Sequence, residues 1–118
     1  MELKTGDVYL AKRDDIVDIK DKFQLYLSDD YVLLINTNRS KKNVSPYIKK
    51  SECKLLSYDS YICIDTAFIF DPKYPVIKKE QVHPNILKNL ITYLPLSVTI
   101  PKIKINEMIK ILQDSLTS

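Results

Sequence analysis

A small group of residues in this 118-residue sequence combines side-chain types and positions suited to moving protons or holding a phosphate. His83 is its only histidine, and an ordinary imidazole pKa of about 6.5 suits either an acid or a base role. Arg39, Lys41 and Lys42 form a basic cluster within residues 37–46. A proton-transferring group and a cation beside a phosphate are what RNA cleavage through the 2′-hydroxyl requires, and this chemistry needs no metal. We therefore take Arg39 and His83 as candidate catalytic residues, with Lys41 and Lys42 as RNA-binding residues.

Each of these candidates also has a structural interpretation. The cluster around Arg39 is typical of a solvated loop, since it is mixed with Asn, Ser and Pro residues. His83 directly precedes Pro84 at the start of a helical pattern, where its side chain could cap the helix or face solvent. The sequence leaves both interpretations open.

The segment "YDSYICIDTAFIFD", residues 58–71, raises the same question for Asp59 and Ser60. Short polar side chains at this place favour a turn, because they hydrogen-bond nearby backbone groups. They are also candidate catalytic residues, because Tyr58 and Tyr61 beside them could stack on RNA bases. Asp65 lies within the apolar part, and alternation places it on a solvent-facing edge.

The composition bounds the function classes. The chain has the length of one domain, spanning residues 1–118, and its net charge of +3 is too small to indicate nucleic-acid binding by itself. A single glycine, Gly6, excludes glycine-rich phosphate loops. Two cysteines, Cys53 and Cys63, and one histidine at scattered spacing give no zinc pattern, so no metal and no cofactor is expected. Cys63 is expected to be a buried thiol.

The sequence begins without a signal-peptide pattern and has no apolar run of membrane-spanning length. We expect a cytoplasmic protein with no membrane partner. The hydrophobic pattern predicts strands in the first two thirds of the chain and leaves residues 47–57 ambiguous. The expected strands cover residues 7–12, 23–28, 31–36, 61–70 and a short stretch within 76–82.

Two helices are predicted after the strands. Residues 83–94 have apolar residues at helical spacing, with Pro84 in the first turn and Pro95 at the end. Residues 105–116 form the second helix, for which Asn106 is the expected cap. Strands followed by helices predict an α+β fold, a small curled antiparallel sheet or SH3-like barrel with C-terminal helices.

The order of these segments resembles the PemK/MazF-like toxins, an SH3-like barrel family. "GDVYLA" at residues 6–11 is similar to the family's opening strand, and "YVLLINTN" at 31–38 to its central strand with a polar loop. "LLSYDSYICIDTAFIFDP" followed by "ILKNLITYLPLSVTI" resembles its late strand and helix. The resemblance implies a metal-independent endoribonuclease that acts on single-stranded RNA, is paired with an antitoxin protein and forms a homodimer.

Two family positions carry other residues here. The arginine and proline that usually open the central strand are replaced by Asp30 and Tyr31. The arginine that other members place before an aspartate at the end of the late strand is absent from residues 68–71. A second interpretation is therefore a non-catalytic barrel that binds a protein or nucleic acid, such as an accessory protein of a phage or mobile element.

Overall fold

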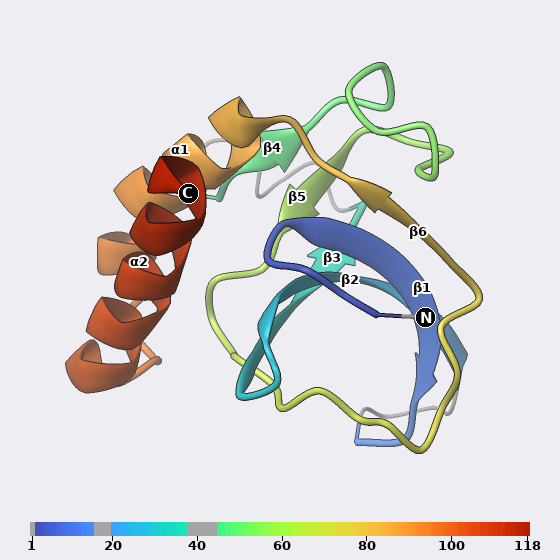
Figure 1. Ribbon diagram of the computed structural model, residues 1–118, viewed down its shortest axis with the longest axis horizontal. Coiled ribbons are helices and arrows are strands. Elements are labelled where there is room, and N and C mark those ends of the chain that lie inside the picture. Colours follow the sequence, from blue (N-terminus) through green and yellow to red (C-terminus); the bar gives the residue numbers. More distant parts are fainter. Residues whose placement is uncertain (1, 16–19, 38–44) are drawn as a thin grey trace.

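A curled antiparallel sheet and two C-terminal helices make up the structure (Figure 1). This computed structural model describes residues 2–15, 20–37 and 45–118. Within these ranges the strands pair in the spatial order β4-β5-β3-β2-β1-β6, each antiparallel to its neighbour. The strands are β1 (Asp7–Arg13), β2 (Lys20–Ser28), β3 (Tyr31–Asn36), β4 (Tyr47–Ile48), β5 (Ser60–Ile62) and β6 (Lys78–Gln81). They are followed by α1 (Pro84–Tyr93), the 3-10 turn η2 (Leu94–Leu96) and α2 (Lys102–Thr117).

The predicted fold class is confirmed. The strands expected at residues 7–12, 23–28 and 31–36 and within 76–82 are all present, and the ambiguous stretch after residue 46 begins with the short strand β4. The predicted helix at 83–94 corresponds to α1 with Pro84 in its first turn. Alternation and helical periodicity were sufficient here because each element buries one face.

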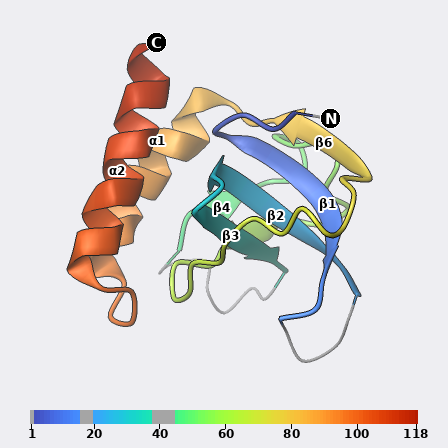
Figure 2. The ribbon, with the colours of Figure 1, turned by 60° about the horizontal axis from the view of Figure 1, so that its bottom comes forward.

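Both helices cover the same face of the sheet (Figures 1 and 2). Val8, Leu25 and Leu33 project from the three central strands into this main core and are fully buried. The helices contribute one apolar stripe each, which explains why α1 and α2 are amphipathic. The buried helix residues are Ile86, Leu87 and Leu90 of α1 and Ile105, Met108 and Leu112 of α2.

The opposite face of the sheet has a second, smaller core. Tyr9, Ala11 and Val32 are buried there, and Phe68 and Phe70 pack on them from the segment between β5 and β6. The Phe70 ring meets the Tyr9 ring edge-on, with 6.1 Å between the ring centres. This segment therefore covers part of the face that the helices leave open.

The strand predicted for residues 61–70 is wrong beyond Ile62. Ile62 pairs with Ile35, but Val32, three residues earlier on β3, pairs with Phe68 rather than with a residue three positions after Ile62. Three residues therefore bulge out, and the exposed Asp65 lies among them, as expected for a solvent-facing acid. An odd insertion reverses the faces, so Ile62 points into the main core and Phe68 into the second one.

Two further expectations need correction. The second helix begins at Lys102, with Pro101 at the N-cap position, so Asn106 lies inside the helix and does not cap it. A proline has a fixed φ and suits a helix start, which sets the boundary earlier than the apolar pattern did. Cys63 is only half-buried, whereas Cys53 is fully buried, and burial raises the pKa of the Cys53 thiol to about 11.

The segment that follows β4 reaches the other edge of the curled sheet. The Lys54 backbone N–H donates to the Glu80 carboxylate on β6 at 2.8 Å. Because β4 and β6 are the two outer strands, this contact links the segments at the two edges of the curled sheet.

Gly6 should be the most sensitive position in the turn before β1. Its φ is +93°, and an added Cβ would lie 2.4 Å from the Gln81 side-chain nitrogen and 3.1 Å from a Leu87 methyl. We expect Gly6→Ala to lower the free energy of unfolding by about 1–3 kcal/mol, measured by urea denaturation. The exposed Thr66→Ala is the control and should change it by less than about 0.5 kcal/mol. Equal stability of the two variants would contradict this account.

Candidate functional site

Asp59 directly precedes β5, and Ser60 is the first residue of that strand, just after the bend at residues 57–58. The Asp59 carboxylate accepts a hydrogen bond from the Lys50 backbone N–H at 2.8 Å. The Ser60 hydroxyl donates to the Tyr58 carbonyl at 2.8 Å, and Ser60 is buried. Both side chains thus stabilise local backbone, as the turn interpretation expects.

The two tyrosines of this segment differ in exposure. Tyr58 is 68% exposed, which leaves its ring open to a stacking partner. Tyr61 is only 7% exposed, because β5 lies between β3 and β4. Tyr58 therefore fits the predicted stacking role better than Tyr61 does.

His83 is the N-cap residue of α1. Its Nδ1 accepts a hydrogen bond from the Asn85 backbone N–H at 3.1 Å, so the capping interpretation is the observed one. This bond uses the Nδ1 lone pair and leaves Nε2 on an exposed ring. No hydrogen bond or ion pair found among the described residues joins His83 to Asp59 or Ser60.

Arg39, Lys41 and Lys42 lie outside the described residues. The described residues on either side of this stretch belong to β3 and β4. Asn36, at the end of β3, and Tyr47, at the start of β4, both pair with Tyr61 in the register of the sheet.

A polar row crosses the sheet at this point, made of Lys22, Asn36, Tyr61 and Tyr47; we call it the Tyr61 row. The Lys22 ammonium donates to the Asn36 side-chain oxygen at 2.8 Å. Asn36 also hydrogen-bonds the Tyr61 hydroxyl; burial raises the pKa of Tyr61, and this bond partly offsets that effect. At neutral pH Tyr61 is therefore a protonated phenol.

The Tyr61 row was not predicted from the sequence. Its members come from four strands, and only the register of those strands brings them onto one face. An ammonium, an amide and two phenols are groups that contact phosphates and base edges. The row thus brings a cation together with directional hydrogen-bonding groups, and Tyr61 lies largely buried among them.

Arg13 was also missed, as a residue with a structural role. It is 2% exposed and lies at the end of β1. Its guanidinium donates to both Asp15 oxygens at 2.8 and 2.7 Å, to Gln24 at 2.8 Å and to the Ile69 carbonyl at 2.9 Å. It also lies 4.9 Å above the centre of the Phe68 ring.

The buried Arg13 cluster continues into the sheet. Gln24 accepts from the Tyr9 hydroxyl at 3.0 Å and donates to the Ala11 carbonyl at 3.1 Å. The guanidinium is therefore engaged by protein groups and is enclosed. Such an arginine is a structural clamp rather than a phosphate ligand.

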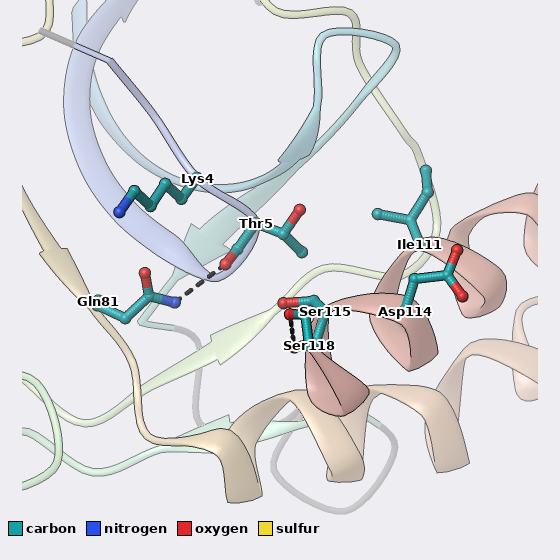
Figure 3. A pocket seen from close by; sticks show the side chains of 7 residues that line it. All are labelled: Lys4, Thr5, Gln81, Ile111, Asp114, Ser115 and Ser118. Atoms are coloured by element: carbon teal, nitrogen blue, oxygen red, sulfur yellow. Dashed lines mark hydrogen bonds between the residues drawn. The ribbon is translucent and has the colours of Figure 1, made fainter.

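A cavity of about 510 Å³ lies elsewhere (Figure 3). It lies between the turn before β1 and the end of α2. At its edge, the Gln81 amide donates a hydrogen bond of 3.0 Å to the Thr5 carbonyl. Figure 3 shows Lys4 on the Gln81 side, away from the Asp114 carboxylate. Its lining contains none of the residues predicted to form the site. The cavity is lined by Lys4, Thr5, Gln81, Ile111, Asp114, Ser115 and Ser118.

A metal-ligand cluster and a membrane-spanning helix are both absent from the described residues. No group of three His, Cys, Asp or Glu side chains there is placed to hold a metal ion. No helix in the same ranges is long and apolar enough to cross a bilayer.

Comparisons of the chain with protein-family models, curated proteins and solved structures gave no match. Its function has therefore to be inferred from its own residues and their arrangement.

The Arg13–Asp15 pair should make the free energy of unfolding depend on pH in the acidic range. The Arg13 guanidinium, through its hydrogen bonds, holds the pKa of the Asp15 carboxyl below its ordinary value of 3.8. A lowered folded-state pKa contributes stability that is present above 3.8 and is lost as pH falls through the lower value. We expect the wild type to lose more unfolding free energy than Asp15→Asn between about pH 5 and pH 2 in urea titrations. Parallel acid profiles would show that the pair contributes nothing.

Proposed function

We propose that this protein is a divergent PemK/MazF-like toxin that binds single-stranded RNA at the Tyr61 row and cleaves it without a metal ion. The observation that carries the proposal is this row, placed where the central strand of a curled antiparallel sheet ends. The sequence resemblance places the family's polar loop after the same strand. An antitoxin protein as partner, a homodimer and a cytoplasmic location belong to the same proposal.

The described groups have distinct roles in this scheme. The Lys22 ammonium, held by Asn36, attracts a backbone phosphate. Tyr58, with its exposed ring, stacks on a base. His83 is assigned the proton transfer; because its Nδ1 accepts the cap hydrogen bond, the neutral ring carries its proton on Nε2, and taking up a second proton breaks that cap bond.

One observation favours the second candidate, a barrel that binds RNA or a protein without cleaving. Cleavage needs a cation to stabilise the charge that develops on the phosphate. Arg13, the arginine within the described ranges, is enclosed by Asp15, Gln24 and Phe68. Among the described residues, Lys22 would then hold RNA without the bidentate donor that suits the transition state; the candidate Arg39 lies outside them.

The binding proposal predicts that Lys22→Gln weakens binding of a labelled single-stranded RNA about fivefold to tenfold and lowers the salt slope by about 0.7. Lys88→Gln, on the exposed side of α1, is the matched control and should leave both unchanged. Fluorescence anisotropy at several salt concentrations measures both quantities. No binding by the folded wild type, or equal losses in the two variants, would contradict the proposed site.

Stacking by Tyr58 is tested separately. Tyr58→Ala should weaken RNA binding by about fivefold or more, because a stacked base contributes about 1–3 kcal/mol. Tyr58→Phe retains the ring and should bind as the wild type does. Equal affinities of the alanine and phenylalanine variants would exclude stacking.

The cleavage proposal predicts growth arrest and fragmented RNA on induced expression of the wild type, and cleavage by the purified protein with a chelator present. His83→Asn is the sharpest variant, because asparagine is a favourable helix cap and removes only the imidazole. We expect it to fold normally and to lose cleavage. Cleavage at the wild-type rate would remove His83 from the reaction. RNA that is bound but left intact by the wild type would select the second candidate.

A further inference from the structure

The connection between α1 and α2 exposes aliphatic side chains that no other part of the described structure covers. Leu96 is 62% exposed, Val98 91% and Ile103 69%. We call residues 95–104 the α1–α2 tip. In Figures 1 and 2 it lies at the end of the helix pair away from the C-terminus and clear of the six strands. Exposing three large aliphatic side chains within one short segment is unfavourable in water unless another molecule covers them.

The charges within the tip itself are of one sign. Residues 81–106 contain no aspartate or glutamate but have Lys88, Lys102 and Lys104. The first acid after them, Glu107, accepts a hydrogen bond from the Tyr31 hydroxyl. From the segment packed against the tip, Asp65 lines the same hollow as Lys104 and is the acid that faces it.

We propose that the α1–α2 tip binds the surface of a membrane rich in anionic phospholipids. Leu96, Val98 and Ile103 enter the boundary between headgroups and acyl chains, while Lys102 and Lys104 contact headgroup phosphates. The absence of a spanning helix in the described ranges does not bear on this, since surface attachment requires none. The site is separate from the Tyr61 row and does not depend on RNA binding.

The shape and composition of the tip favour lipid over a protein partner. Protein interfaces are organised around buried aromatic or arginine side chains, and the tip has neither. Val98 projects rather than lining a groove, as its exposure shows. Beside it lies a hollow of about 330 Å³, lined by Pro95, Ile100 and Ile105 and by the polar Ser97, Lys102 and Asn106. A hollow with apolar and polar walls and one cation suits an amphiphile that carries a negative headgroup.

Vesicle flotation tests the proposal directly. The wild type should float with vesicles that contain phosphatidylglycerol and remain in solution with pure phosphatidylcholine vesicles. Val98→Asp should bind the anionic vesicles at least about tenfold more weakly than the wild type. It replaces inserted apolar surface with a negative charge, which the anionic lipids repel. Ile77→Asp, an exposed aliphatic position on another segment, is the control and should bind as the wild type does.

A tryptophan reporter makes the test specific for insertion. The chain has no tryptophan, so Val98→Trp adds a single emitter at the tip and Ile77→Trp adds one elsewhere. Anionic vesicles should shift the emission of the Val98→Trp protein to shorter wavelength and leave that of Ile77→Trp unchanged. Lys102→Gln combined with Lys104→Gln should reduce vesicle binding about tenfold.

Three outcomes would overturn the proposal. They are no flotation of the folded wild type, equal flotation of Val98→Asp and Ile77→Asp, and an emission shift in both tryptophan variants. Light scattering across protein concentrations distinguishes the main competitor. A dimer that Val98→Asp converts to monomer, without vesicle binding by the wild type, would assign the tip to contact between two copies.

Discussion

The buried guanidinium of Arg13 is the constraint on which the second face of the sheet depends. A buried charge is tolerated only when its donors are satisfied, because desolvation costs several kcal/mol per ion in practice. Gln24 on β2, Asp15 and the Ile69 carbonyl supply these acceptors. The segment after β5 must therefore cross the sheet at Arg13. Its crossing places Phe68 over the guanidinium and beside Val32.

This crossing also explains where prediction from the sequence succeeded and failed. Strands and helices that bury one face were predicted nearly to their ends, because their periodicity is a local signal. Residues 61–70 looked like one strand because their apolar residues are continuous. The two ends of that stretch pack in different cores, Ile62 and Ile64 on the helix side and Phe68 on the other. The odd insertion of three residues achieves this, and the segment beyond it contacts the distant Arg13 through the Ile69 carbonyl and the Phe68 ring.

The candidate site divides in the same way. The hydrogen bonds of Asp59, Ser60 and the His83 cap join residues at most nine apart in the sequence. The sequence pattern indicated a structural role for all three side chains. The Tyr61 row was beyond prediction, because its four members meet only through strand register. Arg13 was hidden for another reason: mixed charges in residues 12–22 are typical of a solvated loop. Its burial depends on acceptors that lie 11 and 56 residues away.

With Arg13 enclosed, the two proposed sites, the Tyr61 row and the α1–α2 tip, would both contact phosphates through lysine. Lysine is a compact point charge that accepts many phosphate geometries, whereas arginine imposes a planar fork. Lysine contacts therefore provide attraction without sequence or headgroup selectivity. Under the two proposals, selectivity has to come from other groups of each site. These are the Asn36 amide and the Tyr58 ring for RNA, and the aliphatic residues Leu96 and Val98 for a membrane surface.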